Sequence, residues 1–307
     1  MVKKLFQGTG VAIVTPFRAD KSVDFVSMGK LIEHIIAGKV DYIVALGTTG
    51  ESVTLNYDEK AAVISFVIEA VNGRIPVVMG AGGNNTHDVV NDVKAIFDEN
   101  IPVAGILSVS PYYNKPSQEG IYEHYKKVAS SCNLPLIIYN VPGRTGSNIA
   151  AETTLRLATE IRNIVAIKEA SGNLSQINHI LKNKPKDFMV ISGDDQLTLP
   201  MIALGASGVI SVSANAFPLE YSEMVRHALK GRMKKAQELQ NALLEIMDTH
   251  FIEGNPAGVK ASLNIKKIID NTLRLPLCPV TDATYNKLKG LISELDKIKA
   301  SLPLSED

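Results

Sequence analysis

Lys168 is the residue whose position in the sequence most strongly suggests chemistry. It directly follows an apolar run at residues 164–167 (IVAI), so its stem is expected to lie in the protein interior. Lysine is rarely buried without a partner, and loss of hydration lowers the pKa of its amine. A neutral amine is the form that attacks a carbonyl carbon to give an imine. The alternative is a structural lysine that pairs with Glu169 or extends to the surface at a strand end.

Other polar segments also follow apolar runs. Residues 47–51 (GTTGE) offer two hydroxyls and successive backbone N–H groups, which can bind a carboxylate, although the segment could also be a simple turn. Residues 110–114 (SPYYN) and 139–146 (YNVPGRTG) place tyrosine, asparagine and arginine in equivalent positions. The Asp194-Asp195 pair could hold a metal or act as an acid–base pair, but we favour a cap for the helix that follows.

Several common catalytic signatures are missing from the sequence. No Gly-x-Ser-x-Gly elbow occurs, and Cys132 and Cys278 lie in unrelated contexts, where we interpret both as incidental thiols. No histidine spacing matches a zinc site, so no metal is predicted. The histidines are expected at the surface; they are His34, His87, His124, His179, His227 and His250.

Short apolar runs must position these polar residues. Each run is apolar at successive positions and bounded by glycine, proline or polar residues, which is typical of parallel strands covered on both faces. Eight such runs occur, at residues 11–14, 42–46, 77–79, 105–109, 136–139, 164–167, 189–191 and 208–212.

Amphipathic segments alternate with these runs, for example at residues 58–71, 86–100 and 151–160. Thr86 is expected to cap the second of these helices with its hydroxyl. Eight alternations of strand and helix predict a (β/α)₈ TIM barrel, because a doubly wound sheet would carry a glycine fingerprint after its first strand. The barrel domain is predicted over residues 1–225. Residues 226–307 are predicted to form a C-terminal helical extension, broken near 254–256 and 275–276.

The composition favours a small-molecule partner. The chain has 307 residues, of which 45% are hydrophobic and 21% charged. Its 32 basic residues balance its 32 acidic residues, so neither nucleic acid nor a membrane surface is an expected partner. No apolar run is long enough for a membrane span, and residues 1–8 become polar too early for a signal peptide. We therefore expect a cytoplasmic protein.

The polar segments together resemble a known family. Residues 110–116 (SPYYNKP) and 139–146, with Lys168 and its neighbours, resemble the class I pyruvate aldolases that include N-acetylneuraminate lyase and dihydrodipicolinate synthase. The resemblance extends from residues 8–10 to 273–276. It implies that Lys168 forms an imine with C2 of pyruvate, which becomes an enamine nucleophile without any external cofactor. It also implies a homotetramer built as a dimer of dimers.

The resemblance assigns further roles to residues at the strand ends. Tyr139 is implied to be the general acid–base group, connected through Thr48 to Tyr113 of a neighbouring subunit. A phenol needs its pKa tuned for such a role. Substrate binding is implied for three other positions, with Thr49 holding the pyruvate carboxylate and Gly193 and the Ile210 carbonyl lining the pocket.

Arg144 is the residue that would select the second substrate. A guanidinium can bind a carboxylate through two parallel hydrogen bonds, and in the synthase branch of the family the matching arginine binds aspartate semialdehyde. The function implied is condensation of pyruvate with that aldehyde in lysine and diaminopimelate biosynthesis. The alternatives are a related lyase acting on a 2-keto-3-deoxy sugar acid or N-acetylneuraminate, and a non-catalytic protein that binds a keto acid.

The resemblance also implies a possible allosteric lysine site between subunits. A cationic Lys60 at this site would repel a dicationic ligand, so we expect inhibition by lysine to be weak or absent. The matching positions are Ser52, Val53, Tyr57, Lys60, Asn84, Asp88 and Tyr112.

Overall fold

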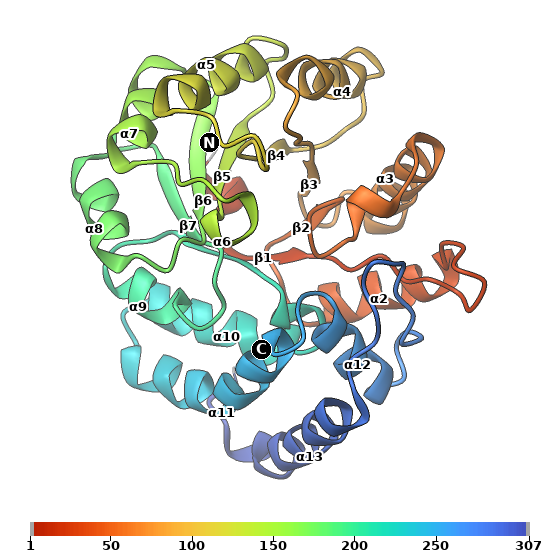
Figure 1. The fold of residues 1–307 in the computed structure, drawn as a ribbon. Coiled ribbons are helices and arrows are strands. Elements are labelled where there is room, and N and C mark those ends of the chain that lie inside the picture. Colours follow the sequence, from red (N-terminus) through yellow and green to blue (C-terminus); the bar gives the residue numbers. More distant parts are fainter. Residues whose placement is uncertain (1–2, 305–307) are drawn as a thin grey trace.

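The computed structural model describes residues 3–304 and shows a closed barrel of eight parallel strands surrounded by helices (Figure 1). Neighbouring strands pair in sequence order, and β1 closes the barrel against β8. The predicted (β/α)₈ barrel is therefore confirmed. The strands are β1 (Gly8–Ala12), β2 (Tyr42–Ala45), β3 (Val77–Gly80), β4 (Gly105–Val109), β5 (Leu136–Asn140), β6 (Ile164–Glu169), β7 (Met189–Ser192) and β8 (Gly208–Ser211).

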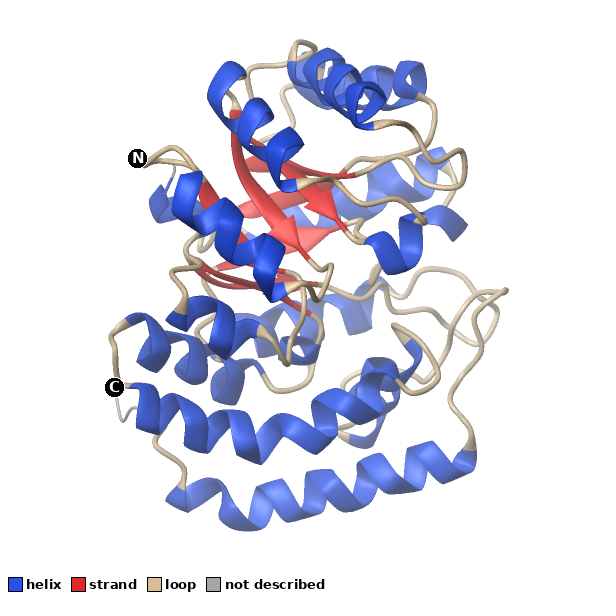
Figure 2. Ribbon diagram, turned by 60° about the vertical axis from the view of Figure 1, so that its left-hand side comes forward, coloured by secondary structure: helices blue, strands red, loops and turns tan. Residues whose placement is uncertain are grey.

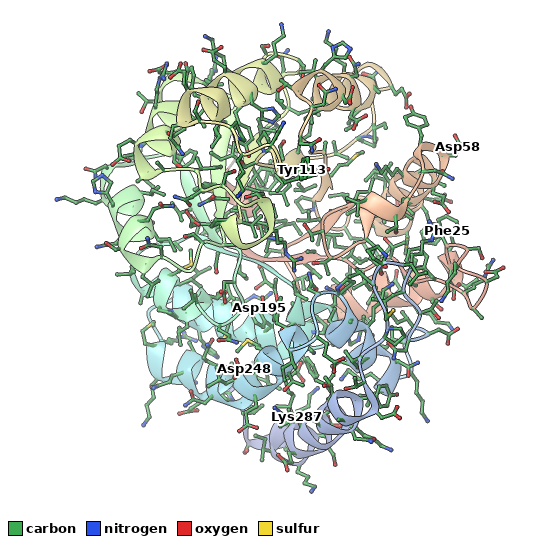
Figure 3. All side chains as sticks on the ribbon, viewed as in Figure 1. Phe25, Asp58, Tyr113, Asp195, Asp248 and Lys287 are labelled. Atoms are coloured by element: carbon green, nitrogen blue, oxygen red, sulfur yellow. The ribbon has the colours of Figure 1, made fainter. Side chains whose placement is uncertain are left out.

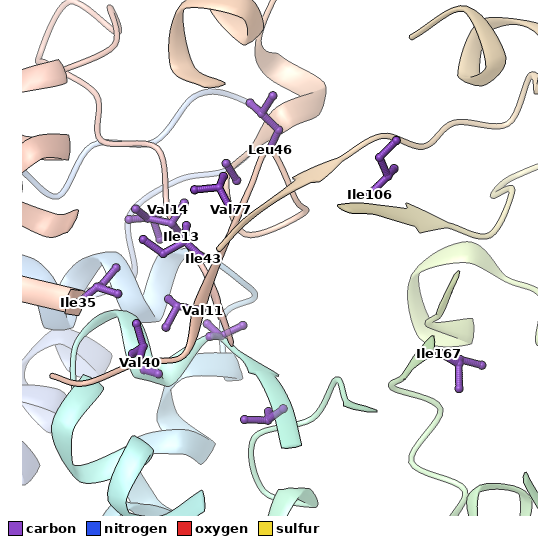
Figure 4. Packing of buried hydrophobic residues seen from close by; sticks show 14 of the residues in the cluster. Val11, Ile13, Val14, Ile35, Val40, Ile43, Leu46, Val77, Ile106 and Ile167 are labelled. Atoms are coloured by element: carbon purple, nitrogen blue, oxygen red, sulfur yellow. The ribbon is translucent and has the colours of Figure 1, made fainter. Parts of the chain in front are cut away.

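Successive strand residues pack into two different hydrophobic clusters. Val44 and Ile191 belong to the cluster inside the barrel, whereas Val11 and Ile43 belong to the larger cluster between strands and helices (Figure 4). Because side chains alternate between the two faces of a strand, both faces must be apolar. This explains why the strands appear in the sequence as continuous apolar runs.

The first strand begins earlier than its apolar run predicts. Residues 8–11 pair with residues 208–211 to close the barrel. The close approach requires glycine, since a Cβ at Gly208 would lie 2.0 Å from the carbonyl oxygen of Gly8. Glycine has low strand propensity, so the start of β1 carries no apolar signal.

The surrounding helices agree closely with the predicted amphipathic segments. The predictions at 58–71, 86–100 and 151–160 correspond to α3, α4 and α7. The helices up to the end of the barrel are α1 (Lys3–Phe6), α2 (Phe25–Ala37), α3 (Tyr57–Val71), α4 (Thr86–Asp98), α5 (Gln118–Ala129), α6 (Pro142–Thr145), α7 (Ala151–Glu160), α8 (Leu174–Asn183), α9 (Thr198–Ala203) and α10 (Pro218–Leu229).

Two local predictions are wrong. The Thr86 hydroxyl bonds to His124 Nδ1 at 2.9 Å, and Asn85 accepts the backbone N–H of His87 instead. Three histidines that were expected at the surface are buried, namely His124, His227 and His250. A neutral imidazole can be buried when its two nitrogens find partners, as those of His250 do with Ser213 and Ser262.

The chain after β8 is helical, with short 3₁₀ turns η2 (Ser213–Asn215) and η3 (Lys299–Ser301) besides η1 (Ser52–Thr54) earlier. The extension contains α11 (Met233–Phe251), α12 (Ala257–Ile265) and α13 (Asp282–Ile298), which lie along one side of the barrel (Figure 2). Residues 1–2 and 305–307 of the two predicted domains lie outside the described residues. The predicted boundary at 225/226 falls within α10, and we propose to place it after that helix.

Candidate active site

A cavity of about 880 Å³ opens at the carboxyl ends of the strands and extends toward α3 and α4. In (β/α)₈ barrels this end of the barrel carries the chemistry, because the loops after the strands converge there. Most of the predicted catalytic and binding residues line it together, namely Thr48, Thr49, Tyr139, Arg144, Lys168 and Gly193.

Lys168 lies within β6, beside Tyr139 of β5. Its side chain is 5% exposed, and Nζ lies 4.4 Å from the centroid of the Tyr139 ring. Burial lowers the pKa of Lys168 to about 8; the charge of Asp195 opposes this shift and that of Arg144 adds to it. A substantial fraction of the amine is therefore neutral near physiological pH.

Glu169 does not neutralise Lys168. Adjacent strand residues point to opposite faces, so the carboxylate of Glu169 lies on the outer side of the barrel. It accepts hydrogen bonds from Asn140 Nδ2 at 3.1 Å, Gln176 Nε2 at 3.0 Å and the Ser171 N–H at 2.8 Å. Its acceptor capacity is thus used within its own network, which argues against the structural-pair interpretation of Lys168.

Gly193 follows β7 and lies directly against the lysine stem. A Cβ at this position would be 3.0 Å from Lys168 Cε and 2.8 Å from the Cβ of Ala170. A larger residue would clash with Ala170 and press against the lysine stem. Glycine at 193 therefore leaves room for the Lys168 side chain beside β7.

Tyr139 is buried, and burial raises its pKa to about 12, with the charge of Arg144 opposing the shift. Its phenol is therefore protonated at neutral pH. The expected proton chain is not assembled within one chain: Thr48 is exposed, and Tyr113 is 87% exposed and is not part of the cavity lining. Figure 3 shows Tyr113 on the side of the barrel near α4 and α5. Its backbone has a φ of 72°, which is unusual for a bulky residue.

Thr49 lies in the loop between β2 and η1 and is buried. Its hydroxyl accepts a hydrogen bond from Asn255 Nδ2 at 3.0 Å. Two residues later, Glu51 is buried with a φ of 52° and pairs with Lys260 Nζ at 2.5 Å. Arg274 also donates its backbone N–H to Glu51 Oε2 at 3.1 Å. The C-terminal extension thus supports the loop predicted to bind the carboxylate.

Asn255 and Lys260 are functional-site residues that sequence reasoning did not identify. They lie in the extension, more than 200 positions from the loop that they contact. The only local signal was the helix break predicted around residues 254–256. That break places Asn255 between α11 and α12, where it reaches the cavity.

Arg144 lies on α6, a single turn that begins at Pro142 and ends before Gly146, which has a φ of 73°. Its side chain is exposed at the cavity mouth. Ile210 is buried within the barrel and is not among the residues that line the cavity, whereas Val212 is.

The aspartates after β7 have structural hydrogen bonds. Asp194 Oδ1 accepts the N–H groups of Gln196 and Leu197, which lie before the first residue of α9, and the predicted cap is wrong because no side chain caps this helix. Asp195 is buried and accepts the Ser213 N–H at 2.7 Å; it lies on the α9–α10 side in Figure 3. Among the described residues, no group of histidine, cysteine and acidic side chains could hold a metal ion.

The predicted allosteric positions divide into two groups. Asn84 and Asp88 do not line the cavity, and Asp88 accepts a hydrogen bond from Asn85 Nδ2 at 2.9 Å. Within one chain, the other positions share the cavity of the catalytic residues; these are Ser52, Val53, Tyr57, Lys60 and Tyr112.

A (β/α)₈ barrel with a buried lysine of lowered pKa beside a tyrosine defines a class of enzymes that react with carbonyl compounds through an imine. The model of the dihydrodipicolinate synthetase family matches residues 5–295, and the chain belongs to this family. A 4-hydroxy-tetrahydrodipicolinate synthase from Parabacteroides distasonis is 52% identical over 94% of this chain and 97% of the relative.

Two solved structures support the same assignment. Dihydrodipicolinate synthase from Thermotoga maritima superposes with a TM-score of 0.92 at 40% identity, over 95% of this chain and 99% of the other. The chloride-inhibited dihydrodipicolinate synthase from Acinetobacter baumannii, complexed with pyruvate, superposes with a TM-score of 0.91 at 40% identity, over 94% and 99% of the two chains. Among the residues described here, no helix combines the length and apolar character that a membrane span needs.

Proposed function

We propose that this protein condenses pyruvate with L-aspartate 4-semialdehyde to give 4-hydroxy-tetrahydrodipicolinate, in cytoplasmic diaminopimelate and lysine biosynthesis. The observation that carries the proposal is the buried Lys168 amine, whose pKa is lowered to about 8 beside Tyr139 in the cavity. The named relatives and the pyruvate complex of a similar protein support the substrates.

In the proposed reaction, the neutral Lys168 amine attacks C2 of pyruvate, and the carbonyl oxygen leaves as water. The resulting cationic imine acidifies the methyl group, which loses a proton to give an enamine. The enamine carbon adds to the aldehyde, whose oxygen gains a proton. The amino group of the second substrate then attacks C2 and displaces Lys168, which closes the ring. The protonated Tyr139 phenol is suited to supply and recover protons in these steps.

Carboxylate binding is divided between two sides of the cavity. The Thr49 hydroxyl and the backbone N–H groups of its loop are proposed to hold the pyruvate carboxylate. Arg144 at the mouth is proposed to bind the carboxylate of the aldehyde. Gly193 and the backbone of Ile210 are proposed to border the substrate at the ends of β7 and β8.

We propose that the active form is a homotetramer composed of two dimers. Tyr113 supports this proposal because a large aromatic side chain is exposed in a strained conformation outside the cavity. If Tyr113 enters the cavity of a partner subunit, it can complete a proton chain through Thr48 to Tyr139. A single subunit would then lack one member of its relay.

Reduction with borohydride in the presence of pyruvate tests the imine. The parent protein should gain the mass of reduced pyruvate at Lys168, whereas Lys168→Ala should gain none and should lose turnover with little change in melting temperature. Lys182→Ala, on the outer helix α8, is the matched control and should be labelled like the parent. Residual turnover within about tenfold of the parent would show that another lysine is the nucleophile.

Aldehyde consumption coupled to the reductase that uses the cyclic product tests the second substrate. A clear pyruvate-dependent rate is expected. If pyruvate and borohydride label Lys168 but no such rate is seen, the imine step stands and aspartate semialdehyde is rejected as the second substrate. Sugar acids or N-acetylneuraminate would then be tested as substrates.

Inhibition by lysine is proposed to be weak or absent. Lys60 presents a cation among the matching positions, although the charge of Asp92 on α4 partly balances it, since the two groups interact. In the same coupled assay, micromolar lysine should leave the rate nearly unchanged, and strong inhibition at that concentration would contradict the proposal.

A further inference from the structure

The loop proposed to bind the carboxylate, residues 46–51, has an unusual backbone conformation at both ends. Leu46 and Glu51, at its two ends, both have positive φ values, 57° and 52°, in a region that side chains other than glycine rarely adopt. Such conformations persist only where surrounding contacts hold them. Thr15 contributes one contact from within the barrel, through its hydroxyl to the Gly50 carbonyl at 2.7 Å.

Further contacts come from the extension, and one of them involves Thr49, the residue proposed to bind the carboxylate. Asn255 is buried, lines the cavity and donates its Nδ2–H to the Thr49 hydroxyl oxygen at 3.0 Å. A hydroxyl has one hydrogen and two lone pairs. Because Asn255 occupies a lone pair, the Thr49 hydrogen remains available to donate to another group.

We propose that Asn255 is a positioning residue that makes Thr49 a hydrogen-bond donor toward the carboxylate of pyruvate. The inference rests on the proposed function, because it assumes that Thr49 binds this carboxylate. The amide of Asn255 acts through Thr49 and does not react. It links the junction of α11 and α12 to substrate affinity, a role that goes beyond holding the extension in place.

The testable feature is the direction of the hydrogen bond, in which Asn255 donates and the Thr49 hydroxyl accepts. In Asn255→Asp, a carboxylate would accept the Thr49 hydrogen, so that Thr49 could no longer donate to pyruvate, and its negative charge would repel the substrate carboxylate. In Asn255→Ala, the hydroxyl would lose its orientation but keep its hydrogen. The charge of Asn255→Asp alone would also weaken pyruvate binding, so the comparison with Thr49→Val below decides whether Asn255 acts through Thr49.

The experiment measures KM for pyruvate, KM for the aldehyde, and kcat. Asn255→Asp is expected to raise the KM for pyruvate about tenfold to hundredfold. Asn255→Ala is expected to raise it by a smaller factor. The KM for the aldehyde should change by less than about twofold. Asn264→Asp is the matched control, because Asn264 lies on α12 and bonds to Ile269 and Tyr285 within the extension. It should leave the KM for pyruvate near the parent value.

A double-mutant cycle tests whether Asn255 acts through Thr49. Thr49→Val removes the hydroxyl while keeping the side-chain shape, so adding Asn255→Ala to it should change the KM for pyruvate by less than about twofold. An equal cost of Asn255→Ala in both backgrounds would overturn the proposal, even if Asn255→Asp does not fold.

Borohydride labelling separates this inference from the proposed function. If the parent is labelled by pyruvate and Asn255→Asp is labelled at the same pyruvate concentration, only the positioning role is overturned. If the parent is not labelled at all, the proposed function and the positioning role are overturned together.

Discussion

At the scale of single residues, burial controls the reactivity of the candidate site. The same low-polarity surroundings lower the pKa of Lys168 and raise that of Tyr139, because desolvation disfavours the charged form of each group. Both shifts favour neutral side chains at physiological pH. The site therefore combines a nucleophilic amine with a phenol that retains its proton, which is the pairing that imine formation needs.

The lowered pKa of Lys168 predicts a specific pH profile. Only the neutral amine attacks pyruvate, so kcat/KM for pyruvate should rise about tenfold per pH unit below about pH 8 and level off above it. Steady-state rates or borohydride labelling rates between about pH 6 and 10 provide the measurement. An inflection near 10.5, the ordinary value for lysine, would mean that burial does not tune this amine.

Arg144 should affect both affinity and that profile. Arg144→Ala should raise the KM for aspartate semialdehyde about tenfold to hundredfold, since a charge-assisted contact is lost. The positive charge of Arg144 also lowers the pKa of Lys168, so its removal should move the pH inflection upward. Arg144→Lys restores the charge but not the planar fork, and should therefore restore the inflection better than the affinity. Unchanged kinetics in both variants would remove Arg144 from the site.

At the scale of elements, the contact between the β2–η1 loop and α12 is the part of the site that should be most sensitive to substitution. The ion pair between Glu51 and Lys260 is fully buried. Burying two charges costs much of what their attraction contributes, but removing one partner leaves the other uncompensated. A single substitution of either Glu51 or Lys260 should therefore be strongly destabilising.

Lys260→Met should destabilise the protein by about 3–5 kcal/mol in denaturant unfolding, because the Glu51 carboxylate then remains buried without its cation. The double variant Glu51→Gln/Lys260→Met should recover much of this loss, since neither charge is left unpaired. Arg74→Ala, which breaks an exposed pair with Glu33, is the control and should change stability little. Equal losses in the single and double Lys260 variants would contradict this explanation.

The sequence predicts strands and strand-end residues well because both depend on local patterns. Lys168 is conspicuous because a charged residue directly follows an apolar run. The start of β1 gives no signal because its residues include glycines, which lack strand propensity. Asn255, by contrast, acquires its role only when α12 packs against a loop that lies 206 residues earlier. The buried state of His250 likewise depends on Ser213 and Ser262, which no local pattern connects to it.

At the scale of the whole molecule, the single chain lacks one expected component of its site. Tyr113 is predicted to enter the cavity of a partner. A two-fold symmetric dimer exchanges such residues reciprocally, so each cavity would use Lys168 of one subunit and Tyr113 of the other.

Mixing two inactive variants tests this exchange. Lys168→Ala and Tyr113→Ala subunits, each nearly inactive alone, should recover activity when they are unfolded and refolded together. About one quarter of the parent activity is expected, because about half of random dimers are hybrids and each hybrid has one complete cavity. Sedimentation analysis should confirm that both variants still assemble. No recovery in properly assembled hybrids would place Tyr113 outside the partner's site.

The long reach between Thr49 and Asn255 also has a consequence for synthesis of the chain on the ribosome. The hydrogen bond joins residues 206 positions apart, and translation adds about 5–20 residues per second. Thr49 is therefore synthesised roughly 10–40 s before Asn255. Nascent chains that carry all eight strands would still lack the Asn255 contact to Thr49, and their affinity for pyruvate should therefore rise only once the residues between α11 and α12 have been added.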